Sequence, residues 1–415
     1  MPELLVYSDW HGARGPRLLG TLVAETVRGR ESFAFSFDEA RLRDRGDLAV
    51  LDPELSLWSG RQYPARGNFG LFLDSCPDRW GRRLIRRREA LRAARSDEPL
   101  RRLRESDFLL GVYDRTRIGA LRFKAVPDGP FLDDDTRLPT PPWTTLRRLE
   151  AAARRLSSDD GLASDAEEER WLSLLLAPGS SLGGARPKAN VLAPDGSLWI
   201  AKFPAKSDGA DVGAWEGVAA DLARAAGLRL PETKTARFSR AGTTFLTKRF
   251  DRDAAGGRVH FASAMTMLGA ADGESGERSY LELADFLARN GAAPREDLAE
   301  LWRRIVFSIA VGNTDDHLRN HGFLLEDRGW RLSPAYDLNP NPETAGALSL
   351  CIDNDDATAD FSLALRVAPH FRLAPAEADA ILARVREAVA PWRSVAAARG
   401  IPARQIDTYR TAFSP

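Results

Sequence analysis

Apolar and polar side chains alternate along the first part of the chain. Residues 4–8, 19–23 and 33–37 follow this pattern, which is typical of strands with one buried face. Residues 119–125 form a further run of the same kind. The pattern predicts a β-rich N-terminal subdomain over residues 1–125.

The pattern changes twice further along. Residues 126–140 are rich in Pro and Asp, which is typical of a linker. Residues 141–258 combine short apolar runs with helical spacing, and residues 259–415 are mostly helical in pattern. We therefore expect an α+β protein with a β-rich start, a small middle lobe and a helical C-terminal lobe.

Two apolar runs and one amphipathic segment define the middle lobe. Residues 197–204, which include Lys202, and residues 243–250 predict buried strands. Residues 214–227 have apolar positions at helical spacing and end in a glycine, which stops helices. A buried lysine needs a partner, and Glu216 in this predicted helix is the candidate. The alternative for Glu216 is a solvated acid favoured by the helix dipole.

Composition narrows the class of protein. The 415 residues suffice for two or three domains, and 59 basic residues balance 59 acidic ones, which argues against binding of nucleic acid by the whole chain. Residues 79–95 are strongly basic; a solvated helix face is the usual interpretation, and contact with DNA phosphates is the alternative. No apolar run approaches the roughly 20 residues that span a bilayer, so we expect a cytoplasmic protein. Cys76 and Cys351 indicate neither a disulfide framework nor a zinc site.

Candidate chemistry concentrates in one C-terminal segment. Asp315 precedes Asn320 by five residues, and Asp337 follows. Protein kinases use an Asp to accept the substrate hydroxyl proton, an Asn five residues later to bind magnesium, and a later Asp to bridge the metal to the phosphates. Residues 322–325 and 330–332 predict a hairpin that returns Asp337 towards the loop. Asn and Asp are also ordinary turn formers, but turns alone do not require this order.

A Gly-rich segment over residues 179–190 is the candidate for contact with phosphates, because glycines let backbone N–H groups approach an anion. It matches neither of the common Gly-rich nucleotide motifs, so a plain turn is the alternative.

Asp316 is the neighbouring alternative to Asp315 as the base. His317 is expected to form hydrogen bonds and is counted among the ATP-binding residues.

The catalytic segment resembles the HipA family of bacterial serine/threonine kinases, the toxin half of toxin–antitoxin pairs, and the resemblance extends over nearly the whole chain. It implies ATP and Mg²⁺ as cofactors, Asp315 as the catalytic base, and Asn320 and Asp337 as the magnesium ligands. The family's loop serine is an autophosphorylation site whose modification inactivates the kinase. Ser181 matches that serine, and Ser180 is its close neighbour.

The same resemblance extends the expected ATP site. The family's Ser-x-x-Gly-Ala-x-x-Lys loop is matched here, although Arg186 and Pro187 replace a polar or acidic pair found in many members. Lys202 would hold the phosphates and pair with Glu216, and the backbone of residues 248–250 would meet adenine. The full expected set is Gly183, Gly184, Ala185, Lys188, Lys202, Glu216, Lys248, Arg249, Phe250 and His317.

The resemblance also implies partners. They are a small helix-turn-helix (HipB-like) antitoxin, operator DNA reached through that antitoxin, and a protein substrate; family targets include aminoacyl-tRNA synthetases. The alternative from another class is a non-catalytic, kinase-like co-repressor subunit that acts with a DNA-binding partner. A small-molecule kinase on the same scaffold is a third interpretation.

Overall fold

The computed structural model describes residues 3–10, 15–44, 48, 50–133, 140–157, 172, 175, 184–271, 273–343 and 346–414. The chain forms two compact units. The first unit combines Met1–Lys206 with Lys248–Ala262, and the second combines Ser207–Thr247 with Ser263–Pro415. The boundaries expected from the sequence, near residues 125, 140 and 258, stay predictions.

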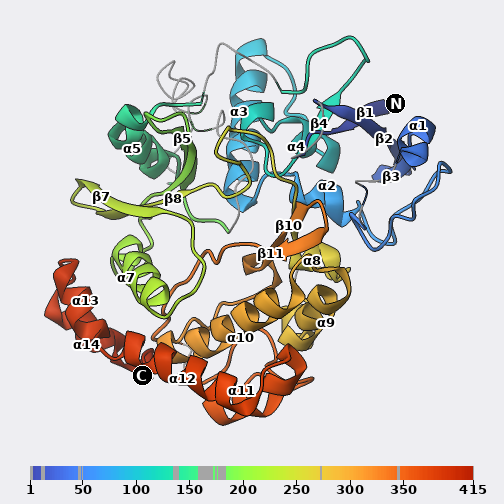
Figure 1. The fold of residues 1–415 in the computed structure, drawn as a ribbon. Helices are drawn as coiled ribbons and strands as arrows, with labels where there is room; N and C mark the ends of the chain where they lie inside the picture. Colours follow the sequence, from blue (N-terminus) through green and yellow to red (C-terminus); the bar gives the residue numbers. More distant parts are fainter. Residues whose placement is uncertain are drawn as a thin grey trace. The chain divides into compact units, whose positions relative to one another are not determined.

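The first unit begins with a four-stranded antiparallel sheet in the order β3-β2-β1-β4 (Figure 1). Its strands are β1 (Glu3–Ser8), β2 (Arg17–Val27), β3 (Arg30–Phe37) and β4 (Leu121–Lys124). In β1, Leu4, Val6 and Ser8 are buried and the residues between them are not, as alternation requires. The four strands predicted from alternation are confirmed.

Helices and one hairpin complete the first unit. The helices are α1 (Glu39–Arg43), α2 (Gly70–Asp74), α3 (Arg79–Ser96), α4 (Glu105–Leu110) and α5 (Leu146–Ser157). The hairpin consists of β5 (Lys188–Leu192) and β6 (Leu198–Lys202). Trp80 of α3 donates a hydrogen bond from Nε1 to the Lys188 carbonyl oxygen at 2.9 Å, so α3 is fixed to the first residue of β5.

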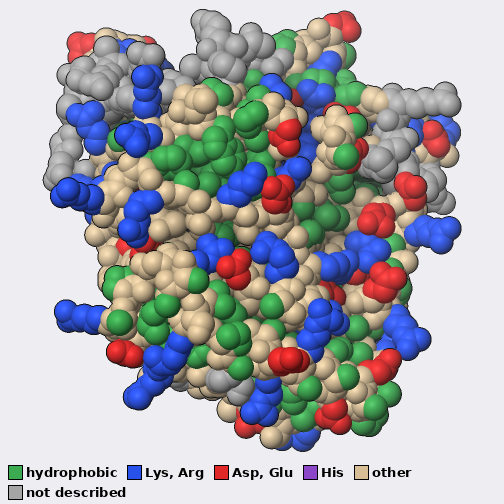
Figure 2. Space-filling model, turned by 60° about the vertical axis from the view of Figure 1, so that its left-hand side comes forward, with side chains coloured by type: hydrophobic (Ala, Val, Ile, Leu, Met, Phe, Trp, Pro, Cys, Tyr) green, Lys and Arg blue, Asp and Glu red, His purple; other side chains and the backbone are tan. Residues whose placement is uncertain are grey.

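The basic helix predicted for residues 79–95 is α3. Arg82 forms two hydrogen bonds to the Glu105 carboxylate at 2.6 and 2.7 Å, and Arg92 pairs with Glu89 at 2.9 Å. Part of its positive charge is therefore neutralised by nearby acids. Positive and negative side chains are interspersed on the face that Figure 2 shows, in keeping with the zero net charge.

Among the described residues, the second unit holds two hairpins and most of the helices. The hairpin of β7 (Thr233–Ser239) and β8 (Gly242–Lys248) follows α7 (Val212–Ala225), and β9 (Phe261–Ser263) lies at the unit boundary. The remaining elements are α8 (Ala264–Met267), α9 (Tyr280–Asn290), α10 (Pro294–Val311), β10 (Gly322–Glu326), β11 (Gly329–Leu332), α11 (Phe361–Val367), α12 (Pro375–Val389), α13 (Trp392–Ala398) and α14 (Ala403–Thr408).

Helix α10 is the centre of this unit. It packs against α9 and α12 (Figure 1), and Leu298, Leu301, Trp302 and Ile305 on it are fully buried. These positions recur every three or four residues, which places them on one face of a helix. Among the described residues no helix is long and apolar enough to cross a membrane.

An aromatic cluster joins α7 to the end of the chain. The Trp215 ring stacks on Tyr409 with 3.9 Å between centroids, and Trp392 stacks on Phe413 at 4.1 Å. The helix predicted over residues 214–227 is α7, which starts and ends two residues earlier than expected. Because of these contacts α7 belongs to the same unit as the C-terminal helices.

Candidate active site

The segment that carries Asp315 begins where α10 ends. Gly312 stops the helix in a left-handed conformation with φ 63°, and a Cβ there would lie 2.4 Å from the Ala412 carbonyl oxygen. Only glycine fits both conditions. Residues 313–321 follow as a loop with one 3₁₀ turn over Leu318–Asn320; we call them the catalytic loop.

The two neighbouring aspartates of this loop have opposite environments. Asp315 is exposed, whereas Asp316 is 3 % exposed. Oδ2 of Asp316 accepts hydrogen bonds from the Tyr280 hydroxyl at 2.6 Å and the Ser308 hydroxyl at 3.3 Å, and Oδ1 lies 3.1 Å from Nε2 of His321. A substrate can reach Asp315 but not Asp316, which favours Asp315 as the reacting carboxylate.

Asn320 lies beside Asp315. Its Nδ2 donates to the Asp315 carbonyl oxygen at 2.8 Å. Asn320 is 5 % exposed, and its Oδ1 has no hydrogen-bond partner among the described residues. A buried carbonyl oxygen without a partner costs free energy unless a ligand or water satisfies it. The Nδ2 bond fixes the amide, so that Oδ1 is the group presented to a ligand.

Asp337 approaches the loop after the predicted hairpin. Strands β10 and β11 pair in the register Phe323↔Leu332, which confirms the hairpin. Asp337 itself has φ 59°, an uncommon conformation for a residue with a side chain. Nδ2 of Asn339 donates to its Oδ1 at 3.2 Å. A residue held in such a conformation is a functional candidate.

Three hydrogen bonds join the segment around Asp337 to the catalytic loop and to Gly312 directly before it. The Tyr336 hydroxyl donates to the Arg319 carbonyl oxygen at 2.7 Å. The backbone N–H of Asn339 donates to Oδ1 of Asn313 at 3.1 Å, and that of residue 341 donates to the carbonyl of residue 312 at 2.9 Å. The structure therefore brings together the three residues that the sequence placed in kinase order.

Electrostatics agrees with this proximity. Partial burial raises the pKa of Asp315, the nearby His317 lowers it, and the negative charges of Asp337 and Asp316 raise it, with a net increase. Burial alone would also raise the pKa of Asp316, but His321 and the hydrogen bonds to Asp316 outweigh burial and lower it. Asp316 is thus stabilised as a carboxylate in the core, whereas Asp315 binds its proton more readily.

The donor set suits magnesium. Asn320 and Asp337 offer an amide oxygen and a carboxylate, and Mg²⁺ prefers oxygen ligands. No group of three or more His, Cys, Asp or Glu in the described part of the chain could hold a metal ion by itself. Mg²⁺ in kinases is usually held by one or two side chains together with phosphates and water, and the residues present fit that pattern.

The expected phosphate-binding lysines lie in the first unit. Lys188 and Lys202 are register partners in the β5–β6 hairpin and are 4 % and 6 % exposed. Residues directly opposite each other in an antiparallel pair share a face, so two cations lie side by side. Nζ of Lys188 is 2.7 Å from Oδ2 of Asp78 and donates to the Gly184 carbonyl oxygen at 3.1 Å.

Other expected ATP-binding residues divide between the two units. Glu216 is 3 % exposed on α7, in the second unit, so its pairing with Lys202 of the first unit stays a prediction. His317 lies in the catalytic loop, with Nδ1 buried and without a hydrogen-bond partner in the described part. Gly184 and Ala185 are described, in the turn before β5. Gly183, Ser180 and Ser181 lie outside the described residues.

The expected adenine-binding segment begins at the end of β8. The Arg249 N–H donates to the Leu198 carbonyl oxygen at 2.9 Å. The Arg249 side chain is buried, donating to the Asp251 carboxylate at 2.8 Å and to the Thr116 carbonyl oxygen at 2.6 Å. Asp251 also accepts from the Gly119 N–H at 2.8 Å. These bonds attach the segment after Lys248 to the N-terminal part of the first unit.

Comparison with known proteins identifies the family to which this architecture belongs. Residues 180–392, just over half of the chain, match the sequence model of the HipA-like C-terminal domain. The chain belongs to this HipA-like family. Over its whole length it is also similar to the HipA toxin of Shewanella oneidensis MR-1, solved with HipB and operator DNA, with a TM-score of 0.67 and 17 % identity, covering 99 % of this chain and 95 % of the other. This likeness establishes a HipA-like, kinase-type fold.

Curated relatives of the HipA-like chain come from Sinorhizobium fredii. One, named "Putative kinase Y4mE", is 29 % identical over 182 residues, which are 38 % of this chain and 41 % of the relative. Another, named "Putative kinase Y4dM", is 31 % identical over 156 residues, 34 % of this chain and 37 % of the relative. The matches thus span about two fifths of the length of these relatives.

Sequence reasoning missed part of the HipA-like site. Asn313 is 1 % exposed and bonds to both Ser308 and Asn339. Asn339 also carries a buried Oδ1 that has no hydrogen-bond partner within the described ranges. Each Asn lies two positions from a candidate acid, Asp315 or Asp337, and that spacing was the available signal.

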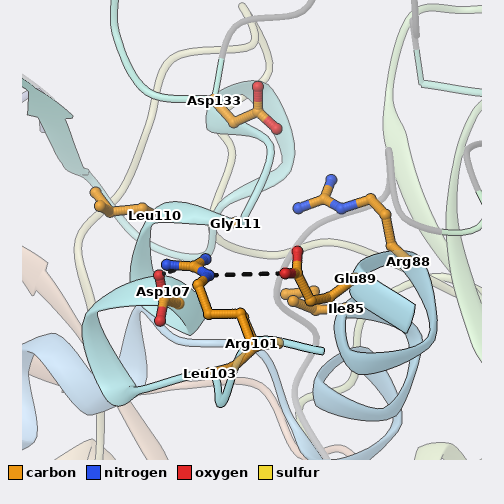
Figure 3. Close-up of a pocket in the computed structure, with 9 residues that line it drawn as sticks. All are labelled: Ile85, Arg88, Glu89, Arg101, Leu103, Asp107, Leu110, Gly111 and Asp133. Atoms are coloured by element: carbon orange, nitrogen blue, oxygen red, sulfur yellow. Dashed lines mark ion pairs between the residues drawn. The ribbon is translucent and has the colours of Figure 1, made fainter. Parts of the chain in front are cut away.

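One described pocket of about 260 Å³ lies in the first unit of the HipA-like chain. Figure 3 shows it between α3, α4 and Asp133, with Arg101 paired to Glu89 and with Arg88 reaching in from the helix. It contains none of the predicted ATP-site residues. Its lining is Ile85, Arg88, Glu89, Arg101, Leu103, Asp107, Leu110, Gly111 and Asp133.

Proposed function

We propose that this chain is an ATP- and magnesium-dependent serine/threonine protein kinase of the HipA type. The observation that carries the proposal is the catalytic loop, in which an exposed Asp315 lies beside the unsatisfied oxygen of Asn320. Membership of the HipA-like family supports it, as do relatives named as kinases.

In the proposed reaction a serine or threonine hydroxyl of a protein substrate lies against Asp315. Asp315 accepts the hydroxyl proton while the hydroxyl oxygen forms a bond to the γ-phosphorus of ATP. The bond between the γ-phosphorus and the bridging oxygen breaks, and ADP leaves with that electron pair. The increased proton affinity of Asp315 suits a carboxylate that accepts a proton in the transition state.

Asn320 and Asp337 would hold magnesium in this site. The bound ion neutralises negative charge on the phosphates. Asn320 would contribute Oδ1, since its Nδ2 is used by the Asp315 carbonyl oxygen. Asp337 would contribute its carboxylate, with Asn339 holding Oδ1 from the other side.

We propose that the Gly-rich loop and the two lysines of the β5–β6 hairpin hold the phosphates of ATP. Two buried ammonium groups on one sheet face repel each other unless anions lie near them. Asp78 supplies one such anion to Lys188. We propose that phosphates interact with Lys202, which pairs with Glu216 as in kinases, and that the backbone of residues 248–250 meets adenine.

We further propose that a small helix-turn-helix antitoxin restrains this kinase and links it to operator DNA. The similar HipA toxin was solved together with HipB and operator DNA. Autophosphorylation at Ser181, or at Ser180, would inactivate the enzyme. A phosphoserine adds a charge of about −1.5 to −2, which would repel the ATP phosphates from the same loop.

Phosphoryl transfer from γ-labelled ATP tests the proposal directly. We expect the purified wild type, but not Asp315→Ala, to label itself, with the added mass on Ser181 or Ser180, and phosphoproteomics after induction to identify protein substrates. A wild type that transfers no phosphate to itself, to proteins or to small hydroxyl compounds, yet binds operator DNA with its partner, would favour the co-repressor alternative. Label on small molecules alone would favour a small-molecule kinase.

A further inference from the structure

The catalytic loop contains a second carboxylate that the proposed reaction does not use. Asp316 cannot reach a substrate, because its side chain is 4 % exposed. Burying a carboxylate is costly unless it is fully paired. The cost is offset here by three partners on three different elements: Tyr280 at the start of α9, Ser308 on α10, and His321 directly before β10.

Two of these partners lie at the two ends of the catalytic loop along the chain. Ser308 lies before it, and His321 is its last residue. A single carboxylate therefore connects α10, which enters the loop, to the last residue of the loop, directly before β10. It anchors both to α9 through Tyr280. Between these anchors lie Asp315 and Asn320, the residues that the proposed reaction needs.

The network continues to the other acid of the site. Ser308, which donates to Asp316, accepts a hydrogen bond from Nδ2 of Asn313 at 3.3 Å. Oδ1 of Asn313 accepts from the Asn339 N–H at 3.1 Å, and Nδ2 of Asn339 donates to Asp337 at 3.2 Å. A continuous chain of hydrogen bonds thus runs from Asp316 to Asp337 without passing through Asp315 or Asn320.

Such a chain is suited to fixing distances. Catalytic groups must stay within about 0.5 Å of their productive positions, and a displacement of about 1 Å can cost roughly 10²-fold in rate. Asp337 has an additional need for support, because its φ of 59° is disfavoured for a residue with a Cβ.

We infer that Asp316 and Asn313 are positioning residues, which hold the base Asp315 and the metal ligand Asp337 in a fixed relation through the Asp316–Ser308–Asn313–Asn339–Asp337 chain. The inference rests on the proposed phosphoryl transfer. The inference goes beyond the proposed reaction because it assigns roles to two buried residues that have no part in binding substrate or metal in that reaction.

The test compares Asp316→Leu, Asp316→Asn and Asn313→Ala with the wild type in titrations of ATP and of Mg²⁺ that are carried to saturation. Asp316→Leu removes every bond and should lower kcat roughly 10²-fold, while Asp316→Asn keeps one acceptor oxygen and should recover roughly tenfold of that loss. The KM for ATP should change little. Asn313→Ala should raise the magnesium concentration needed for half-maximal activity, because Asp337 loses its support.

Asp297→Asn is the matched control. Asp297 is also a fully buried carboxylate in the second unit, bonded to Arg229, Arg331 and the Leu332 N–H, but it does not belong to the chain described above. Asp297→Asn should lose thermal stability to a degree similar to that of the Asp316 variants, but it should keep the wild-type kcat. Equal kcat values for Asp316→Leu and the wild type would overturn the inference, as would an equal loss of kcat in Asp297→Asn.

Two further measurements cover the remaining outcomes. If Asp316→Leu does not fold, Tyr280→Phe removes a single donor and should still lower kcat, with an unchanged KM for ATP; no decrease would contradict the inference. If the wild type transfers no phosphate, the proposed function fails, and hydrogen–deuterium exchange decides the positioning role. Exchange across residues 313–321 and 337–341 should accelerate in Asp316→Asn but not in Asp297→Asn, and equal rates would refute it.

Discussion

Two polar segments were expected to bind parts of one ligand, and their side chains are used differently. In the catalytic loop, Asp315 is exposed, and Oδ1 of Asn320 has no partner among the described residues. At the start of β5, by contrast, Nζ of Lys188 already has an ion pair with Asp78 and a hydrogen bond to the Gly184 carbonyl oxygen. The first segment thus leaves an acceptor oxygen unpaired among the described residues, whereas the cation of Lys188 in the second is already paired.

The difference lies in what supports each segment. The catalytic loop is held by buried residues next to the candidate site residues. The side chains of Asp315 and Asn320 are therefore not needed as anchors, apart from the Asn320 amide nitrogen. Lys188 is itself the anchor, since it connects β5 to the residue that caps α3. Residue spacing alone therefore does not distinguish a side chain that could bind a ligand from one that stabilises the fold.

The largest effect is expected in the catalytic segment. Asp315→Ala and Asp337→Ala should each lower phosphoryl transfer by roughly 10²–10⁴-fold, measured with γ-labelled ATP, because one would remove the proposed base and the other a proposed metal ligand. Only Asp337→Ala should weaken magnesium-dependent nucleotide binding. Asp327→Ala, in the exposed turn between β10 and β11, is the control. An active Asp315→Ala beside an inactive Asp316→Ala would move the base by one residue.

The next largest effect is expected at Lys202. Lys202→Ala should weaken nucleotide binding by roughly tenfold or more, because hydrogen bonds to charged groups contribute about 1.5–3 kcal/mol. Lys202→Arg should rescue poorly, since the planar guanidinium does not reproduce a compact ammonium. Titration with a fluorescent ATP analogue measures this, with the exposed Lys234→Ala as control. A wild-type titration curve for Lys202→Ala would mean that Lys202 is a core residue.

Lys188 should act mainly on stability. Lys188→Met should lower the free energy of unfolding by about 3 kcal/mol, because it leaves the nearly buried Asp78 carboxylate without its cation. The double variant with Asp78→Asn should recover part of the loss, since Asn also caps helices well. Urea unfolding of the two single variants and the double variant measures the coupling. Additive losses would show that the pair is not a stabilising unit.

The smallest effect is expected at Glu216. Glu216→Gln should raise the KM for ATP several-fold without abolishing turnover, because it would remove the charge that we propose orients Lys202 but keep the shape of a buried side chain. Steady-state kinetics measures this, with the exposed Glu232→Gln as control. An unchanged KM would indicate that Glu216 has only a structural role on α7.

Much of the fold followed from local pattern. Alternation identified β1 to β4, and helical spacing identified α7. The candidate site was partly predictable: order and spacing selected Asp315, Asn320 and Asp337, and the hairpin between them is present. The supporting network was not predictable, because Asn313 and Asn339 are 26 residues apart and single Asn residues are common in turns.

The sequence by itself determined the elements and the order of the reacting residues, because strand and helix periods depend on near neighbours. Only the tertiary structure decided which of two adjacent aspartates is exposed, and that Lys188 pairs with a residue 110 positions away. Burial and ion pairing depend on what other segments bring to the same place. Asp315 and Asp316 are alike in chemistry, and Tyr280, Ser308 and His321 make them different.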